Sequence, residues 1–435
     1  MSLRVEIVSS GTVRAASWGL LDQVLSSLTN FALTFTAARS LDPHAFGGFW
    51  LAFAAYLLAL GFSRSVGSEP LVVRFSGARE EEWRAGVRQA AGTAFTVGTV
   101  AGAVAVAAGA TWGGPAGESL VAMGVFFPGL LLQDIWRFAF FATGRGGAAA
   151  TNDAIWAATM SVGLVALAWW GRASAWDFAL VWGASGTVAS LVGVAQARIV
   201  PRPSDSRAWL AAHRDLASRF SAQFLVQTGS GQAALYLIAA LAGLAAVGGI
   251  RAAQVLLGPL NVVFMGTGLF AVPEASRQAR SGSIVAVRRT GLFVSAGLLA
   301  AVTAWAAAAA ILPDHVGEAV LGKNWPVARS FLGPVALAMA ASAVSAGAAT
   351  VLRGLADAGR SLRAAAFQGL LTVAAAAAGA SLGGGLGAAW GLASALIVAS
   401  VGWWSLCARA LRDARSEARL RGVRAPSVEW ETQSS

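Results

Sequence analysis

Long apolar runs separated by short polar breaks extend over almost the whole 435-residue chain. Each run is about 20 residues long, and at about 1.5 Å of helical rise per residue it crosses roughly 30 Å of hydrocarbon. The first two runs, within residues 22–76, flank one short break and predict a transmembrane hairpin. We predict twelve spans in all, at residues 15–38, 46–64, 89–111, 119–141, 149–170, 176–198, 220–243, 251–272, 290–312, 328–352, 362–382 and 386–408.

Short sequence echoes connect the two halves of the chain. Phe46-Gly47-Gly48-Phe49 is echoed by Val247-Gly248-Gly249-Ile250 at an offset of 201 residues, and Trp182-Gly183 and Gly144-Arg145 recur as Trp390-Gly391 and Gly359-Arg360. The common order of these echoes indicates an internal duplication. Six spans in each half make both halves enter from the same side, so the predicted fold is an all-α polytopic membrane protein. It has two six-helix bundles related by a parallel pseudo-twofold repeat about an axis along the membrane normal.

The longest polar connection divides the chain between the two predicted bundles. We expect an N-terminal bundle at residues 1–200, a cytoplasmic linker at 201–219, a C-terminal bundle at 220–410 and a basic cytoplasmic tail at 411–435. Within the linker, Trp209, Leu210 and Leu216 alternate with arginines. This pattern is typical of either a short amphipathic helix at the lipid headgroups or a plain linker.

The composition excludes several classes of protein. Hydrophobic residues make up 56% of the chain and charged residues 12%, which leaves too little polar surface for a soluble globule. The single cysteine, Cys407, excludes an internal disulfide, and three scattered histidines argue against a structural zinc site. The sequence also has no GxxxxGK[ST] phosphate loop and no long outer loop that would hold an acceptor sugar. We therefore expect no metal, no cofactor and no enzymatic activity.

The net charge of +11 is distributed unevenly along the chain. All but five of the 32 Lys and Arg residues fall in the N-terminal segment, every second loop and the C-terminal tail. The positive-inside rule then places both termini in the cytoplasm. The basic charge is explained by topology, so we expect no nucleic-acid partner. The five residues on the opposite side are Arg39, Arg172, Arg251, Lys323 and Arg329.

Three segments resemble a known family of membrane proteins. The run from Ala38 to Phe49, followed by Gly61 and Arg74, resembles the opening hairpin of bacterial polysaccharide and O-antigen flippases. The segments 321–325 (LGKNW) and 384–391 (GGLGAAWG) are similar to the C-terminal half of the same proteins. These flippases belong to the multidrug/oligosaccharidyl-lipid/polysaccharide exporter superfamily. The resemblance covers nearly the whole chain and implies a bacterial inner-membrane protein whose two bundles form a V and which works without ATP hydrolysis.

Polar side chains at helical spacing mark the candidate substrate site. Amides both donate and accept hydrogen bonds, which suits sugar hydroxyls, and arginine forks suit a pyrophosphate. The alternative explanation is interhelical hydrogen bonding, which these side chains commonly provide in membranes. The predicted substrate-binding residues are Gln23 and Asn30 in the first span, Arg64 at the end of the second, Gln227 and Gln232 in the seventh, and Arg251, Gln254 and Asn261 in the eighth.

Carboxylates within the spans are candidates for energy coupling, because a charge at the bilayer centre costs about 2.5–3.5 kcal/mol and needs a partner or a cavity. Asp134 and Arg137 lie three residues apart in one span. Either they neutralise each other or Asp134 is protonatable and couples transport to a proton gradient. Asp22 is the other coupling candidate, although Asp22 and Asp153 both lie near the predicted cytoplasmic interface, where solvation alone would explain them.

Together these features predict a flippase that moves a lipid-linked oligosaccharide across the inner membrane by alternating access. Its expected partners are that substrate, membrane lipid, and the glycosyltransferases or polymerase of polysaccharide assembly. One alternative is a cation-coupled multidrug extruder of the same superfamily. Another is a non-transporting membrane scaffold with a degenerate flippase fold that recruits partners through its tail. The sequence leaves the saccharide, the lipid carrier and the coupling ion open.

Overall fold

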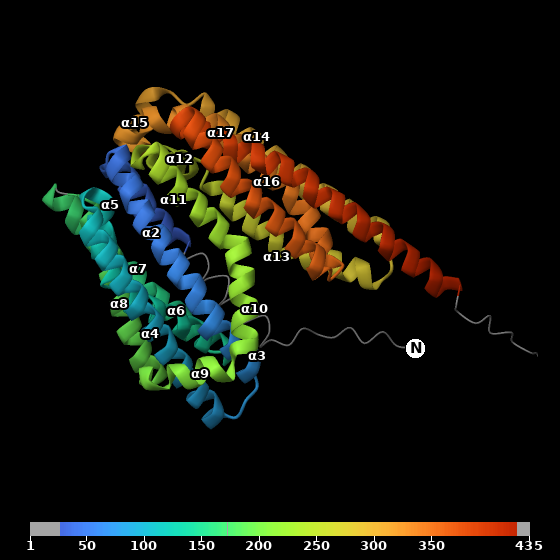
Figure 1. The fold of residues 1–435 in the computed structure, drawn as a ribbon, viewed down its shortest axis with the longest axis horizontal. Helices are drawn as coiled ribbons and strands as arrows, with labels where there is room; N and C mark the ends of the chain where they lie inside the picture. Colours follow the sequence, from blue (N-terminus) through green and yellow to red (C-terminus); the bar gives the residue numbers. More distant parts are fainter. Residues whose placement is uncertain (1–26, 172, 424–435) are drawn as a thin grey trace, which may run out of the picture.

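The helices of the two halves form two bundles that meet at one end and diverge toward the other (Figure 1). The computed structural model describes residues 27–171 and 173–423, and every regular element among them is a helix. Of the described helices, eight are long and apolar enough to cross a membrane, or ten if each of two bent pairs is one span. The predicted all-helical polytopic fold is confirmed, and the count of twelve spans stays a prediction.

Helix boundaries in the first half follow from local sequence. Helix 27–40 ends before Asp42, whose carboxylate accepts hydrogen bonds from the backbone N–H groups of His44 and Ala45 at 2.9 and 3.0 Å. Pro43 occupies the first position of the next helix, where a backbone N–H would have no hydrogen-bond acceptor within the helix, so the lack of an N–H in proline costs nothing. The elements that follow are α2 (Pro43–Ser63), the π-helix η1 (Arg64–Ser68), α3 (Glu69–Phe75), α4 (Glu80–Trp112), α5 (Gly114–Gly124), α6 (Phe127–Ala142), α7 (Gly146–Trp170) and α8 (Ala175–Ala197).

The second half repeats this scheme with one long terminal helix. Non-helical backbone angles at Gly383 and Gly384 divide that helix, α17, where we predicted a break between two spans. The elements are α10 (Arg214–Phe224), the π-helix η3 (Leu225–Gly229), α11 (Ser230–Ala242), α12 (Leu244–Leu256), α13 (Pro259–Arg280), α14 (Ile284–Ala310), α15 (Asp314–Leu321), the 3₁₀ turn η4 (Gly322–Asn324), α16 (Trp325–Gly354) and α17 (Ala358–Val423).

Two spans are sharply bent beside a proline. The axes of α5 and α6 differ by 55° before Pro128, and those of α12 and α13 by 66° before Pro259. Proline has no N–H to donate and its ring clashes with the preceding turn, so the helix breaks there. The predicted eighth span, residues 251–272, is therefore not one straight helix. The bend separates Gln254 on α12 from Asn261 on α13, and these residues do not share one straight helix face.

Glycines at equivalent positions of the two halves bring the bundles into contact. A Cβ atom on Gly47 would overlap the carbonyl oxygen of Leu244, and one on Gly248 would overlap that of Pro43. Both pairs are related by the offset of 201 residues, so α2 and α12 make the same contact in both directions. This reciprocal contact matches the predicted parallel repeat.

The hydrophobic cores show where the halves are joined. Two of the buried clusters combine residues of both halves; one places Trp325 and Ala252 among N-terminal residues, and the other places Leu51 among C-terminal ones. The remaining two clusters draw on one half each, the first with Trp209 from the connecting segment. The halves therefore share a core at the converging end and have separate cores where they diverge.

A single asparagine strengthens the converging end. The side-chain amide of Asn324, which is fully buried, donates hydrogen bonds of 2.6 Å to the carbonyl oxygens of both Ala38 and Leu41. These carbonyls lie at the C-terminal end of helix 27–40, where backbone acceptors lack helical partners. A residue of the second half thus caps a helix of the first.

The connecting segment packs on the N-terminal bundle. It contains η2 (Pro203–Asp205) and α9 (Ser206–Ala212) and continues into α10. Trp209 is buried, and its indole N–H donates to the carbonyl oxygen of Val66 at 2.8 Å. Arg74 forms a two-pronged ion pair with Asp215 at 2.7 and 2.9 Å. The tryptophan therefore faces protein rather than lipid headgroups.

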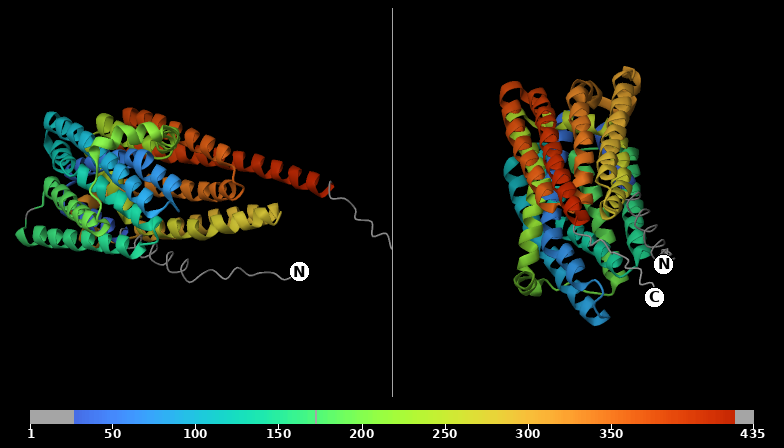
Figure 2. Two further views of the ribbon diagram at one scale, coloured as in Figure 1. Left: turned by 90° about the horizontal axis from the view of Figure 1, so that it is seen from below. Right: turned by 90° about the vertical axis from the view of Figure 1, so that its right-hand side faces the viewer.

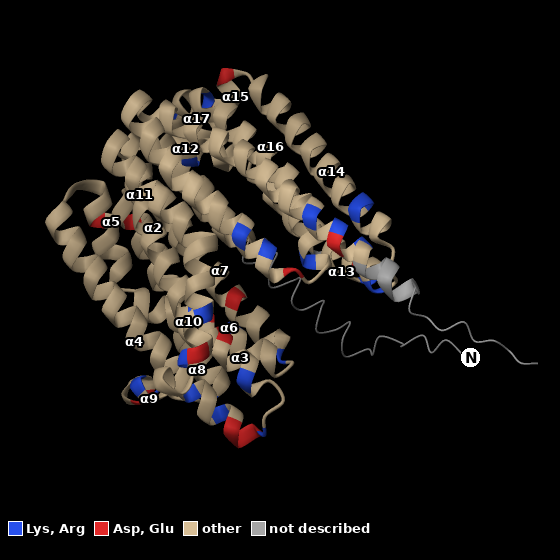
Figure 3. Ribbon diagram, turned by 45° about the vertical axis from the view of Figure 1, so that its right-hand side comes forward, with Lys and Arg blue, Asp and Glu red and all other residues tan. Residues whose placement is uncertain are grey.

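Most of the described Lys and Arg residues lie toward the end where the bundles diverge (Figure 3). The C-terminal part of α17 extends beyond the other helices in the same direction (Figure 2). Arg39, in the last turn of helix 27–40, and Lys323, in η4, are two of the five basic residues that we assigned to the outer side, and the elements that carry them meet at the converging end.

Candidate functional site

An ion pair with two hydrogen bonds joins Arg64 to Asp134 inside the N-terminal bundle. The guanidinium donates from Nε to Oδ2 at 2.9 Å and from Nη2 to Oδ1 at 2.6 Å. The Asp134 side chain is 8% exposed and that of Arg64 is 36% exposed, so the pair has one buried and one accessible member. Both residues were predicted functional residues. Sequence spacing had suggested Arg137 as the possible partner of Asp134, and the structure adds Arg64, which reaches Asp134 from η1.

A π-helical turn places Arg64 at this position. Hydrogen bonds from residue i to i+5 widen the helix over η1 and free backbone groups that an α-helix would pair. In an α-helix the carbonyl of Val66 would accept from residue 70, but that residue is proline and has no N–H, so the indole of Trp209 donates to this carbonyl instead. The connecting segment therefore holds the widened turn that begins at Arg64.

A buried polar network lies beside the ion pair. Gln133 donates to Asp153 Oδ1 at 2.8 Å and to Asn152 Oδ1 at 3.2 Å. Asn152 in turn donates to the Ala189 carbonyl at 2.8 Å and to Gln196 at 3.1 Å. Asp153 is only 5% exposed, so the explanation that solvation alone accounts for it does not hold. The Nε atom of Arg137 lies 3.8 Å from the Oδ2 atom of Asp153.

Sequence reasoning did not select Gln133, Asn152 or Gln196. The first two are the chain neighbours of Asp134 and Asp153, and this adjacency is the signal that would have found them. Tyr56 lies in the same region of the bundle, packed edge-on against Trp182 with 4.6 Å between ring centroids. The ion pair and the network bring α6, α7 and α8 together with η1.

Arg251 lies at the contact between the bundles. Its guanidinium carbon is 4.4 Å from the ring centroid of Trp50, the residue at its equivalent position in the first half, and its Nη1 donates to Gln254 Oε1 at 3.0 Å. A cation over an aromatic face is stabilised by the ring quadrupole. The Nε atom is buried and has no hydrogen-bond partner among the described residues. Arg251 is thus held by an N-terminal aromatic ring and by its own helix.

The remaining predicted substrate-binding residues are not gathered at one point. Asn30, Gln227 and Asn261 are exposed, on helix 27–40, η3 and α13 respectively. Gln232 is buried, with its Oε1 unpaired among the described residues. Gln23 and Asp22 lie outside the described residues. No three His, Cys, Asp or Glu side chains within the described ranges are placed to hold a metal ion.

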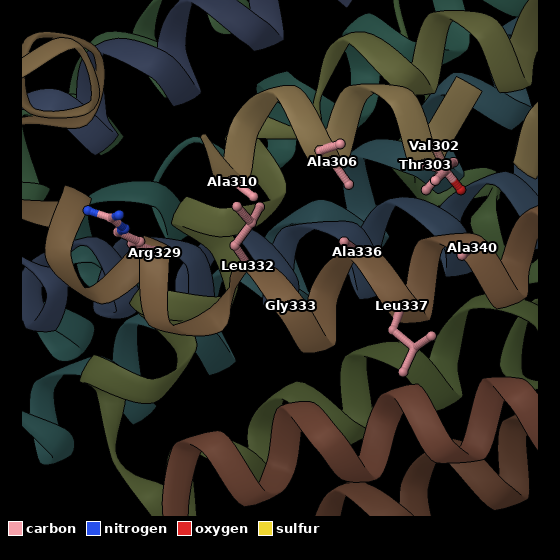
Figure 4. A pocket seen from close by; sticks show the side chains of 11 residues that line it. Val302, Thr303, Ala306, Ala310, Arg329, Leu332, Gly333, Ala336, Leu337 and Ala340 are labelled. Atoms are coloured by element: carbon pink, nitrogen blue, oxygen red, sulfur yellow. The ribbon is translucent and has the colours of Figure 1, made fainter. Parts of the chain in front are cut away.

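A cavity of about 550 Å³ opens between α14 and α16. Figure 4 shows Arg329 at one end and Thr303 toward the other, with Ala306, Ala336 and Gly333 along the walls. Arg329 is already ion-paired with Asp314. The cavity is therefore lined mainly by apolar side chains, and the charge of Arg329 at its end is neutralised by Asp314.

Comparison with solved structures identifies the fold. No protein-family model matches the chain, and a search of curated protein sequences finds no match. The chain is similar to a multidrug resistance MATE family transporter of the MOP superfamily in its inward-facing conformation, with a TM-score of 0.69 at 13% identity over 92% of this chain and 96% of that one.

Two further structures extend this likeness. The inward closed form of the lipid II flippase MurJ has a TM-score of 0.64 at 10% identity over 93% of this chain and 91% of that one. The outward-facing form of a MATE family transporter has a TM-score of 0.56 at 14% identity, covering 93% and 96%. The chain therefore has the fold that these transporters share.

Proposed function

We propose that the protein is a transporter of the MOP superfamily that flips a lipid-linked oligosaccharide by alternating access. The fold supports the class, because the MATE transporters and the lipid II flippase share it over nearly the whole chain. The arrangement of the bundles supports the mechanism. They share a core at one end only, so a rocking motion about the α2–α12 contact would close the diverging end and open the converging one.

The observation that carries the choice of substrate is the state of Arg64. Asp134 occupies its Nε and Nη2 atoms, while Nη1 makes no hydrogen bond to any described residue. The side chain is more than a third exposed, so a donor of fixed orientation is presented to an anionic group. Arginine forks bind phosphate oxygens well, and the ion pair limits the conformational entropy lost on binding. A sugar pyrophosphate headgroup supplies such oxygens.

The exposed amides suit the rest of such a headgroup. Asn30, Gln227 and Asn261 each carry a donor and an acceptor and are exposed on three different elements. In this proposal they bind sugar hydroxyls weakly and in succession. The lipid tail remains in the bilayer, and the protein carries out no covalent chemistry.

Flipping by purified protein in vesicles tests the proposal. A fluorescent lipid-linked pyrophosphate oligosaccharide is incorporated, and its movement between leaflets is followed with a membrane-impermeant quencher. We expect Arg64→Gln to slow flipping by about tenfold or more, the loss of one charge-assisted hydrogen bond. Arg79→Gln removes the same charge from a largely exposed side chain and serves as the matched control. Equal rates for wild-type protein and Arg64→Gln would contradict the assignment.

The buried carboxylates favour a second candidate, the cation-coupled multidrug extruder. Asp134 and Asp153 are both buried in the N-terminal bundle, each beside an arginine, and carboxylates within membrane spans are candidates for energy coupling. Extrusion of a cationic dye from vesicles under an imposed proton gradient separates the two functions. Dye extrusion that Asp134→Asn abolishes, without any flipping of the lipid-linked sugar, would favour the extruder.

A further inference from the structure

A groove of about 890 Å³ runs between α13 and α14 beside the turn that joins them. The turn that joins α13 and α14 lies at the diverging end of the C-terminal bundle (Figure 1). The walls of the groove combine a polar region next to the turn with aromatic and aliphatic side chains further along the two helices. None of the residues that we assigned to the substrate site line it.

The polar region is cross-linked except at one arginine. Gln278 donates to Glu274 at 2.6 Å and accepts from the Thr290 hydroxyl at 2.8 Å, which ties α13 to α14. Arg277 is ion-paired with Glu274. Arg289 also lines the groove, and its side chain forms no ion pair or hydrogen bond with any residue that the structure describes. The groove therefore presents one uncompensated positive charge.

The apolar region begins one helical turn from this polar region. Phe270 precedes Glu274 by four residues on α13 and is 78% exposed, and Phe293 follows Arg289 by four residues on α14 and is 79% exposed. Four residues correspond to about 6 Å along each helix axis. A ligand that spans both regions must carry a negative group and an apolar chain only a few ångströms apart.

We propose that this groove binds one acidic phospholipid from the leaflet at the diverging end. Its phosphate pairs with Arg289, and an acyl chain runs between Phe270 and Phe293. A bilayer supplies amphiphiles with this spacing at high local concentration, and acidic headgroups attract basic side chains at the membrane surface. A soluble anion would leave the aromatic walls unused, and a neutral lipid would leave Arg289 unpaired. The bound lipid packs between α13 and α14, farther from the turn than the hydrogen bond of Gln278 that ties these two helices together.

Native mass spectrometry of the purified full-length chain tests this site. Lipids that stay bound are counted while detergent-solubilised protein is titrated with phosphatidylglycerol or with phosphatidylcholine of the same acyl chains. We expect tight retention of one phosphatidylglycerol, and about a tenfold weaker affinity in Arg289→Gln, because a charge-assisted hydrogen bond is lost. Arg288→Gln removes an equal charge from the adjacent exposed residue, which does not line the groove, and should bind like the wild type.

Three results would overturn the proposal: equal retention of both lipids, equal losses in the two arginine variants, or full displacement of the lipid by millimolar inorganic phosphate. The variant Phe293→Ala tests the apolar part of the groove separately from the charge of Arg289. It should weaken phosphatidylglycerol retention without changing the protein's melting temperature in lipid-free detergent. This experiment measures lipid binding and not flipping. Its result can therefore be interpreted even if the protein does not flip a lipid-linked oligosaccharide.

Discussion

Charged residues inside the helix bundles are placed by partners from distant parts of the sequence. Asp134 and Arg137 are close enough on α6 to suggest a pair, but they face different neighbours, and each meets its partner from another helix. Local spacing identified both residues as exceptional in an apolar span and could not identify the partners. Arg64 and Asp134 are 70 positions apart, and their contact depends on how η1 packs on α6.

Removing the carboxylate of Asp134 should destabilise the N-terminal bundle. In Asp134→Asn the Arg64 guanidinium loses both charge-assisted bonds, and breaking a buried pair costs about 3–5 kcal/mol. Because the Arg64 side chain is partly exposed, we expect the lower end of that range. Thermal unfolding in detergent measures the loss. Glu81→Gln, in an exposed charged turn, is the control and should unfold like the wild type.

A compensating variant checks that the pair itself is responsible. Arg64→Gln combined with Asp134→Asn removes both charges and leaves two amides that can bond each other. This double variant should recover part of the stability that Asp134→Asn loses. Additive losses in the double variant would show that Asp134 stabilises the bundle through other contacts.

Gly47 should tolerate no side chain. In Gly47→Ala the new methyl group meets the Leu244 backbone, which cannot move aside as a flexible side chain would. Overpacking of this kind costs about 1–3 kcal/mol. Gly297→Ala is the matched control, since nothing lies within 4 Å of its Cβ and alanine is the better helix former. A melting temperature that rises in both variants would refute the close α2–α12 contact.

At the scale of helices, hydrophobic periodicity located the elements and missed their bends. The runs of apolar residues correspond to long helices, and the break before residue 386 lies at the non-helical Gly383 and Gly384. Pro128 and Pro259 signalled the sharp bends in the fourth and eighth spans, although the length of an apolar run does not reveal a bend. The π-helical turn η1 ends just before Pro70, which removes the donor that Val66 would use in an α-helix, whereas η3 has no proline beside it and no comparable signal.

The α13–α14 turn should lie on the cytoplasmic side. Arginines gather there, and the positive-inside rule then fixes the orientation of the hairpin. With Cys407 replaced by serine, a cysteine at Ser283 should react with an impermeant maleimide only after the cells are permeabilised. A cysteine at the exposed Glu318 should react in intact cells and serves as the positive control. The opposite labelling pattern would invert the topology.

At the scale of the whole molecule, the internal repeat was the most informative feature of the sequence. The offset that relates the echoed glycines also relates the two sides of the contact that those glycines make. The cross-bundle cap by Asn324 could not be predicted, since it joins residues almost 290 positions apart through a loop turn. The substrate site was predicted as residue types on particular spans, and the buried network around Gln133 was missed because its members do not share a helix.

Loss of the Asn324 cap should loosen the converging end. Asn324→Ala leaves the carbonyls of Ala38 and Leu41 without their donors, at about 1–3 kcal/mol for buried groups that cannot reach water. We expect faster hydrogen–deuterium exchange at the end of helix 27–40. Lys323→Ala, which alters an exposed neighbour, should leave exchange unchanged. Unaltered exchange in Asn324→Ala would show that the cap does not hold the end closed.

Alternating access by the two bundles is the central claim, and distances between spin labels in lipid nanodiscs test it most directly. On a Cys407→Ser background, one pair of labels replaces Glu81 and Ser283 at the diverging ends, and another replaces Glu118 and Glu318 at the converging end; the structure places all four at exposed positions. Addition of a lipid-linked pyrophosphate oligosaccharide should populate a second state in which the first distance shortens and the second lengthens. Distances that stay unchanged, or that change in the same direction at both ends, would contradict the account.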